Sequence, residues 1–457
     1  MRTPALAPSR TRVRRRLTPA FLEGGGEVMG TSVGGSDLGF LREALRHRLT
    51  RRGFLRAAGV GAAGLGLPPL LAACARETGT GGVDVHELFS GPPEGQVNFA
   101  NWPIYIDKAK DPETGERYVP TLRKFEEETG ITVIYKEVIQ DNPSFFGKLQ
   151  PQLQAGQPTG WDIIVISNGW EFTALVKNGW VYPLDTTKRP NFDAHANDWA
   201  KDPPFDPGAK HSMVWQSGLT GIAVNRDLVD APITKLDDLA DPNKLPPGSV
   251  GMLVSEMADF VMWNLGIDPE TSTPDDWRVA ADWLLKQRET GLVRQYYEQN
   301  YVDDLTNGNL AACMAWSGDI LYYHTWGGYP NLEFVFPEGG CLFWTDNMMI
   351  PAGAEHPVAA LMLMDFYYRP RIATDVAEWV LYMSPVKEVQ DLMLEDARKA
   401  EEKGWKGYAR KLYETANSEY LFPTEELLAR TRFGRTFESD EEKAEWDSIF
   451  EPISEQA

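Results

Sequence analysis

Residues 97–166 contain three β-rich runs, which read Val97-Asn98-Phe99-Ala100, Ile131-Thr132-Val133-Ile134-Tyr135 and Asp162-Ile163-Ile164-Val165-Ile166. Helical patterns near Thr121–Thr129 and Ser144–Ala155 separate these runs. This βαβαβ order is typical of a parallel sheet covered by helices. Because parallel sheets bind ligands at the carboxyl ends of their strands, the residues directly after each run are the first candidates for a site.

A second α/β unit begins after the run Gly221–Asn225. It contains a short apolar run at 250–254 and a helix that Thr273 caps and Pro274 opens. Further runs follow at 312–316, 332–336 and 341–350. We therefore expect an α/β protein whose 457 residues form two domains.

Aromatic and acidic residues stand at the ends of several predicted strands. Those after the first and third runs are Trp102, Tyr105, Ser167 and Trp170. Glu256 and Asp259 follow the run at 250–254, and their i, i+3 spacing places both carboxylates on one face of a helix. Acidic residues also favour helix N-termini for purely structural reasons, so this pair has a second explanation.

Two further motifs each place a Trp two or three residues before an Asp. They are Trp316-Ser317-Gly318-Asp319 and Trp344-Thr345-Asp346-Asn347, each near the end of an apolar run. An amine is bound when its charge lies on a Trp face and a carboxylate accepts its N–H bonds. The alternative is a Trp in the core beside a turn-forming Asp, but the repetition of the pattern favours a site for a cation.

From residue 97 to about residue 395 the sequence resembles the bacterial spermidine/putrescine-binding proteins that serve ATP-driven importers. The segments that carry the resemblance are Phe99–Tyr105, Thr129–Val133, Trp161–Val165, Phe205–Pro207 and Gly218–Asn225. The resemblance implies a type II periplasmic-binding-protein fold with a ligand cleft between two domains. It also implies a polyamine ligand and the permease subunits of an ABC transporter as partners.

The same resemblance assigns roles to individual residues. Trp316 and Trp344 should wall the ligand, and its ammonium groups should meet four acids: Glu256, Asp259, Asp319 and Asp346. Lesser contacts fall on Trp102, Tyr105, Ser167, Tyr382 and, beside an apparent insertion, Trp170. Asp319 is nearer the putrescine-type pattern, whereas the acid pair is nearer the spermidine type, so the ligand's length stays open. Pro103 replaces the family's usual Ser or Thr, and the segment after Arg430 matches poorly.

We expect the chain to cross between the domains near Leu219–Thr220 and again near Trp344–Asp346. The first domain then comprises residues 97–219 and 346–390, and the second comprises residues 220–345 and 391–457. Because both halves contribute ligand motifs, closure of the domains can bring the motifs together.

An export signal precedes these domains. Arg51-Arg52 stands before the short apolar run Ala57–Leu71, and Leu71-Ala72-Ala73-Cys74 resembles a lipoprotein cleavage and acylation site. The alternative is a degenerate anchor helix with a chance Cys, but the run is short for a membrane span. We expect residues 1–73 to be a twin-arginine lipoprotein leader and residues 74–96 a flexible tether. The mature protein is then a periplasmic or cell-surface lipoprotein that contacts the membrane through Cys74.

Cys313 and Cys341 each lie three residues before a candidate site Trp. We expect them to face each other on neighbouring strands and to form a disulfide bond in an oxidising compartment.

The charge of the chain is −21, but residues 1–73 hold twelve Arg against four acids, which leaves −29 on residues 74–457. Such a body repels nucleic acid and favours cationic partners, although acidic surfaces also serve solubility. Phosphate-loop and His-Glu-x-x-His motifs are missing from the sequence, so we expect a protein without enzymatic activity, cofactor or metal. We also expect a monomer. A neutral-sugar binder is the alternative function, because sugars also stack on Trp.

Overall fold

The computed structural model describes residues 83–455. The predicted twin-arginine leader and the proposed acylation site at Cys74 lie outside these residues. Within the described part of the chain, no helix is both long and apolar enough to cross a bilayer.

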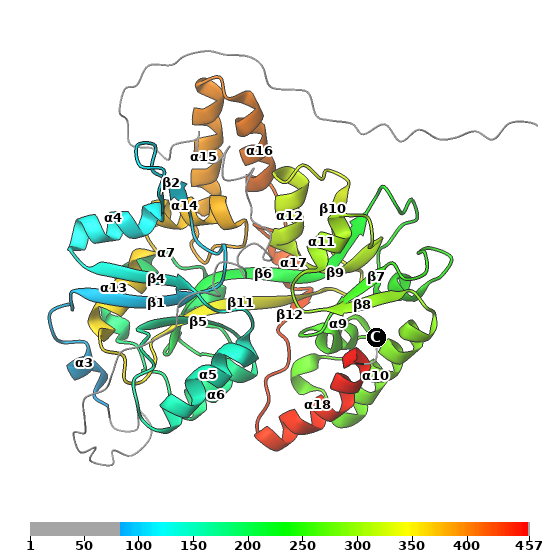
Figure 1. The fold of residues 1–457 in the computed structure, drawn as a ribbon, viewed down its shortest axis with the longest axis horizontal. Coiled ribbons are helices and arrows are strands. Elements are labelled where there is room, and N and C mark those ends of the chain that lie inside the picture. The colour runs from blue at the N-terminus through cyan, green and yellow to red at the C-terminus, as the bar shows by residue number, and fades with distance from the viewer. Residues whose placement is uncertain (1–82, 456–457) are drawn as a thin grey trace, which may run out of the picture.

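The three predicted runs form a parallel arrangement at one end of a large sheet (Figure 1). β1 (Gln96–Asn101) pairs in parallel with β4 (Thr132–Glu137) on one side and with β5 (Ile163–Ser167) on the other. Two helices connect them, α4 (Pro120–Thr129) and α5 (Asn142–Gln154). The βαβαβ prediction is therefore confirmed.

Two long strands run through the middle of the sheet and join its halves. β6 (Ser212–Asn225) and β11 (Cys341–Met349) pair with each other antiparallel, and β11 also pairs antiparallel with β5. The complete strand order is β4-β1-β5-β11-β6-β9-β7-β8. The strands beyond β6 are β9 (Ala312–Trp316), β7 (Val250–Leu253) and β8 (Val293–Tyr297), while β10 (Leu332–Val335) pairs with β6 and β12 (Thr431–Arg432) with β11.

Helices cover both halves of this sheet. Those on the first half are α6 (Trp170–Lys177), α7 (Pro190–His195), α13 (Pro357–Phe366), α14 (Pro370–Val380), α15 (Val389–Glu402) and α16 (Lys406–Ala416). Trp199 of the short helix α8 (Asp198–Lys201) packs on the second core. Those on the second half are α9 (Met257–Asn264), α10 (Pro274–Glu289), α11 (Tyr301–Thr306), α12 (Ser317–Thr325), α17 (Glu425–Leu428) and α18 (Asp440–Glu455). A small ribbon of β2 (Ala109–Lys110) and β3 (Arg117–Tyr118) completes the fold.

Two hydrophobic cores divide the molecule into two lobes, which together give the predicted α/β two-domain architecture. In β6 the first core includes Trp215 and the second includes Leu219. In β11 the second core includes Phe343 and the first includes Met348. The chain therefore passes between the cores close to the predicted crossings.

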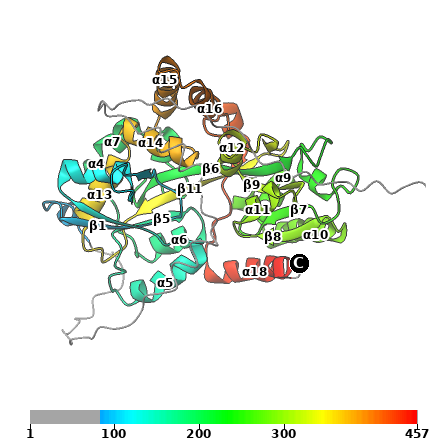
Figure 2. The same cartoon turned by 45° about the horizontal axis from the view of Figure 1, so that its top comes forward.

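The ends of the folded region differ from the prediction. The expected tether at 74–96 contains a short helix, α3 (Val85–Leu88), and the side chain of Phe89 is fully buried in the first core. The assignment of residues 391–457 to the second domain is also wrong for α15 and α16. Met393 and Leu412 belong to the first core, because one apolar face of each helix packs on that lobe. Figure 2 shows α18, in contrast, lying along α10 on the second lobe.

The predicted disulfide is wrong. Cys313 and Cys341 are both free and buried. Cys313 lies on β9 opposite Ala223 of β6, whereas Cys341 lies on β11, on the other side of β6. Strands two positions apart are separated by about 9–10 Å, which exceeds the roughly 7 Å limit on the Cα separation of a disulfide.

Candidate functional site

Asp346 lies where β11 passes the end of β5. Strand register places it opposite Ser167, whose hydroxyl donates a hydrogen bond of 2.5 Å to Asp346 Oδ1. The hydroxyl of Tyr105, from the loop after β1, donates to Oδ2 at 2.7 Å. Burial raises the pKa of Asp346 to about 6, although both hydrogen bonds act in the opposite direction. Three predicted site residues therefore meet in one hydrogen-bonded group.

A second carboxylate group forms on the other lobe. Thr220 of β6 pairs with Trp316 of β9, and both side chains reach Glu256 at the start of α9. The indole Nε1 of Trp316 donates to Glu256 Oε1 at 2.8 Å, and the hydroxyl of Thr220 donates to Oε2. Burial raises the pKa of Glu256, and the charge of Asp346 acts in the same direction. The two carboxylates therefore lie close enough to repel each other.

Asp319 is the third carboxylate, in the first turn of α12. The hydroxyl of Tyr382 donates to its Oδ1 at 3.0 Å, and that of Tyr301 donates to Oδ2 at 3.1 Å. Tyr301 also accepts a hydrogen bond of 3.0 Å from the backbone N–H of Trp316. A Cβ at Gly318 would lie 2.6 Å from the ring of Tyr382, so only glycine lets this ring approach.

Aromatic rings connect the three acids. The ring of Tyr382 lies 5.3 Å from that of Trp344 and 5.7 Å, edge on, from that of Tyr105. Trp344 packs directly on the backbone of Gly218, where a Cβ would come within 2.4 Å of the indole. Within the described chain, the indole Nε1 of Trp344 is buried without a hydrogen-bond partner. A T-shaped contact of 5.8 Å between Tyr301 and Trp316 completes the aromatic lining.

These three carboxylates share a further property. In the described part of the chain, Asp346, Glu256 and Asp319 form no ion pair with Lys, Arg or His, although many other acids of the protein do. Their partners are hydroxyl and indole donors, which orient a carboxylate without neutralising it. The arrangement therefore presents negative charge to a cation that can donate several hydrogen bonds.

Asp259, Trp170 and Trp102, three further predicted ligand contacts, each contact other parts of the protein. Asp259 faces the C-terminal segment: burial raises its pKa to about 7, while the backbone N–H and the charge of Arg435 act in the opposite direction. The ring of Trp170 meets Phe437 of the same segment, edge on, at 6.3 Å. Trp102 donates from its indole to the backbone carbonyl of Val165 at 3.1 Å and packs on the first core.

Sequence patterns missed several residues that build the site. Thr220 lies inside Gly218–Asn225, one of the segments that carry the family resemblance, but nothing in its neighbours distinguishes it from a buried strand residue. Tyr301 stands on a short helix 18 residues before Asp319, and β9 separates the two in sequence, so no helical or strand period relates them. Gly434 and Arg435, which lie beside Asp259, were also missed, because the segment after Arg430 matches the resembled family poorly.

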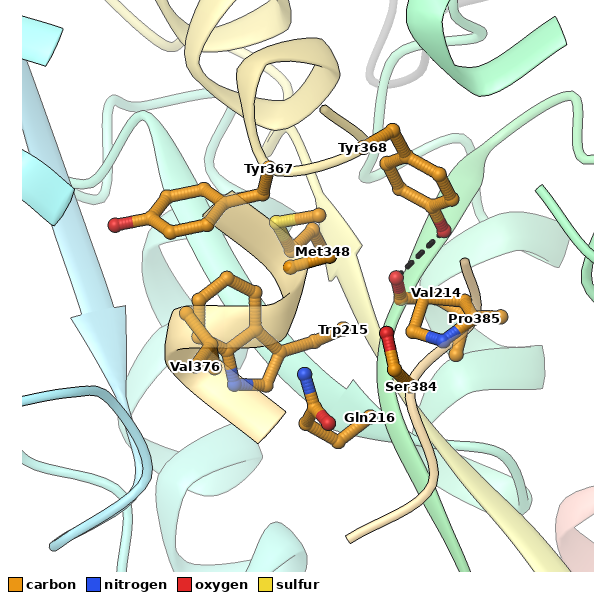
Figure 3. A pocket seen from close by; sticks show the side chains of 10 residues that line it. Val214, Trp215, Gln216, Met348, Tyr367, Tyr368, Val376, Ser384 and Pro385 are labelled. Carbon is orange, nitrogen blue, oxygen red and sulfur yellow. Dashed lines mark hydrogen bonds between the residues drawn. The ribbon is translucent and has the colours of Figure 1, made fainter. Parts of the chain in front are cut away.

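A separate small cavity lies in the first lobe, beside β6 (Figure 3). Its volume is about 10 Å³, close to the space that one water needs. Trp215, Gln216 and Tyr368 line it, and Gln216 Oε1 is buried without a hydrogen-bond partner in the described chain. The cavity is too small for an organic ligand and does not include the three acids.

The fold and the acidic site together place the chain in a known class. Residues 121–406 match the family model of the bacterial extracellular solute-binding proteins, and the chain belongs to this family. Two similar proteins bind polyamines according to their names. The chain is 30% identical to the spermidine/putrescine-binding periplasmic protein of Salmonella typhimurium over 271 residues, which is 59% of this chain and 75% of the relative. It is 29% identical to the putrescine-binding periplasmic protein PotF of Escherichia coli over 319 residues, 66% of this chain and 81% of that protein.

Solved structures support the fold. The spermidine/putrescine ABC transporter substrate-binding protein PotD of Streptococcus pneumoniae superposes with a TM-score of 0.63 at 23% identity, over 79% of this chain and 99% of that chain. A putative spermidine/putrescine ABC transporter protein of Listeria monocytogenes gives the same TM-score at 22% identity, over 80% of this chain and all of that chain. The two-domain binding-protein fold expected from the sequence is therefore confirmed.

Proposed function

We propose that this protein captures a polyamine, putrescine or spermidine, outside the cytoplasm and delivers it to an ABC importer. One observation carries the proposal: Asp346, Glu256 and Asp319 converge beside aromatic rings, and hydroxyl and indole donors orient them without neutralising them. The ligand site also includes Tyr105, Ser167, Trp316, Trp344 and Tyr382, with Trp102 as a lesser contact. The membership of the solute-binding family and the names of the relatives support the same conclusion.

The physical reason is that an ammonium group loses its hydration in a cleft, and only hydrogen-bonded counter-charges offset that loss. Each of the three carboxylates keeps lone pairs for N–H donors after accepting its two bonds from the protein. Trp316 and Trp344 can add cation–π contacts of about 2 kcal/mol each once water is excluded. A neutral sugar gains nothing from unpaired negative charge, so this site suits it less.

Titration calorimetry with putrescine, spermidine and a maltodextrin tests the assignment. We expect binding of at least one polyamine and no heat from the maltodextrin. Saturable maltodextrin binding without polyamine binding would establish the sugar alternative. We also propose that the protein catalyses no conversion of its ligand, which recovery of unchanged putrescine after long incubation checks.

Residues from both lobes form the site: Tyr105 belongs to the first core and donates to Asp346, whereas Trp316 packs on the second core and donates to Glu256. We therefore propose that the lobes close on the ligand about β6 and β11. X-ray scattering should show a smaller radius of gyration at saturating polyamine, and an unchanged radius would contradict closure.

Export and anchoring belong to the proposal as well. We infer a twin-arginine leader, acylation of Cys74 and a monomeric mature protein that reaches the permease while held at the membrane. Mass spectrometry of the mature protein from its native host should find diacylglycerol on Cys74, and an unmodified Cys74 there would contradict anchoring.

A further inference from the structure

A segment near the C-terminus crosses between the two lobes at the edge of the acidic site. We call residues 433–438 the C-terminal strap; they connect β12 to α18. Figure 1 shows the strap passing between α6 of the first lobe and α9 of the second. Phe433 makes T-shaped contacts with Phe205 at 5.4 Å and with Phe343 at 5.1 Å, so the strap touches both lobes from its first residue.

The strap occupies two of the predicted ligand contacts, one from each lobe. On the first lobe, Phe437 is 6% exposed and packs against Trp170, and the Nζ of Lys177 donates to the carbonyl of Glu438 at 2.9 Å. On the second lobe, Arg435 presents its backbone N–H to Asp259. A Cβ at Gly434 would lie 2.8 Å from Asp259 Oδ2, so the backbone itself is in contact with the carboxylate.

Arg435 fixes the strap in this place. Its guanidinium donates to the backbone carbonyls of Pro269 at 3.0 Å and Ser272 at 2.8 Å, and to the carboxylate of Glu442. It also lies over the ring of Trp277, 5.0 Å from the centroid. Asp259 Oδ1 and Arg435 Nε, an acceptor and a donor, are both buried without a hydrogen-bond partner in the described chain. Burial raises the pKa of Asp259 and the charge of Arg435 acts to lower it, although the guanidinium forms its ion pair with Glu442.

We propose that the strap closes one end of the polyamine site and makes the protein selective for short diamines of the putrescine class over longer polyamines. This inference rests on the proposed polyamine function. Asp346, Glu256 and Asp319 remain for the ligand, whereas Asp259 and Trp170 are held by the strap. A third ammonium group that extended toward α9 would meet Arg435 and Phe437 instead of a free carboxylate, and a buried cation without a counter-charge is strongly disfavoured.

Calorimetry on the full mature chain tests the inference with two variants. The wild type should bind putrescine at least about tenfold more tightly than spermidine, the size of effect that one unpaired buried charge produces. Phe437→Ala removes the ring beside Trp170 and should shift the ratio of the two affinities toward spermidine by about tenfold. Phe422→Ala, which removes a half-buried ring that packs on the first core and lies outside the strap, should leave the ratio unchanged and controls for general loosening.

Asp259→Asn is the second variant, and it keeps an oxygen that can accept from Arg435. Its putrescine affinity should stay within about twofold of wild type, whereas Asp319→Asn should lose about thirtyfold or more. A folded Phe437→Ala protein with an unchanged ratio, or a loss in Asp259→Asn equal to that in Asp319→Asn, would overturn the inference while polyamine binding stood. A wild-type protein that bound no polyamine would overturn the proposed function itself.

Discussion

Asp346 and Asp259 are both buried aspartates with raised pKa values, about 6 and about 7, yet their surroundings give them different roles. Asp346 accepts bonds from two side-chain hydroxyls, Tyr105 and Ser167, and forms no ion pair among residues 83–455. Asp259 faces the backbone and the charge of Arg435 on the C-terminal strap. The difference teaches that the partners of a buried acid, more than its burial, decide whether its charge is available to a ligand.

The largest expected effect comes from Asp346→Asn. The substitution keeps the shape of the side chain but leaves a buried ammonium group short of a counter-charge, so putrescine binding should weaken by about 2–5 kcal/mol. Because burial already disfavours the charged form of Asp346, the ligand-free variant should unfold at the same temperature as wild type or higher.

Calorimetry and thermal unfolding measure the two effects separately. Asp275→Asn is the matched control, because Asp275 is a solvent-exposed aspartate that pairs only with surface arginine. Near-wild-type affinity in Asp346→Asn would remove the basis for the polyamine assignment, and a large loss of stability would show that Asp346 is structural, like Asp259.

Trp344→Leu should have a smaller effect, a loss of about 1–2 kcal/mol, because it removes an aromatic face but no charge. A sugar site would reverse the ranking of these two variants, since stacking would then contribute most. The exposed Trp405, at the turn between α15 and α16, supplies the control Trp405→Leu. Calorimetry with putrescine should find a larger loss of affinity in Asp346→Asn than in Trp344→Leu, and no loss in Trp405→Leu. The opposite order of the first two would favour the sugar alternative.

The pH dependence of binding should follow Asp346. Its pKa in the free protein is about 6, and bound ammonium favours the charged form, so lowering the pH makes ligand compete with a proton. Affinity should therefore be constant above about pH 7 and fall by about tenfold at pH 5, one pH unit below this pKa.

The stability of the ligand-free protein should change in the opposite direction. An aspartate whose folded pKa is raised binds more protons when folded, so stability rises as the pH falls from about 7 toward 4. Chemical denaturation at pH 5 and pH 8 measures this slope, which Asp346→Asn should reduce. A slope of the reverse sign would mean that Asp346 is paired with a cation in the free protein.

Local sequence was sufficient for the parts of the fold that obey a period. The β-rich runs of residues 97–166 became β1, β4 and β5 within a residue or two, because alternating strand and helix patterns are written in neighbouring residues. The Trp-Asp motifs were found for a similar reason, because each consists of residues two or three positions apart in the sequence. Contacts distant in sequence were not predictable: that β6 separates Cys313 from Cys341 depends on strand order, which no local pattern encodes.

The strap shows the same limit at the site. Asp259 and Glu256 look alike in sequence, since Glu256 is the N-cap of α9 and Asp259 lies in its first turn. Only the return of the chain at Gly434, more than 170 residues later, distinguishes them. Likewise the sequence did not show that α15 and α16 pack on the first lobe, because which of two adjacent lobes receives them depends on the folded chain.

The smallest effect should come from Tyr301→Phe, which tests the support of the acids rather than the acids themselves. The hydroxyl of Tyr301 accepts from the backbone N–H of Trp316 and donates to Asp319, and it therefore links two residues of the second lobe's half of the site. Its loss leaves Asp319 with the bond from Tyr382 alone. We therefore expect putrescine binding to weaken by about 0.5–1.5 kcal/mol, the usual contribution of the one hydrogen bond that Asp319 loses. Tyr382→Phe should cost a similar amount, and because both hydroxyls orient one carboxylate the double variant should lose more than the two single losses combined. Calorimetry on the three proteins measures this coupling; strictly additive losses would mean that the two tyrosines act separately and that Asp319 does not depend on their joint support.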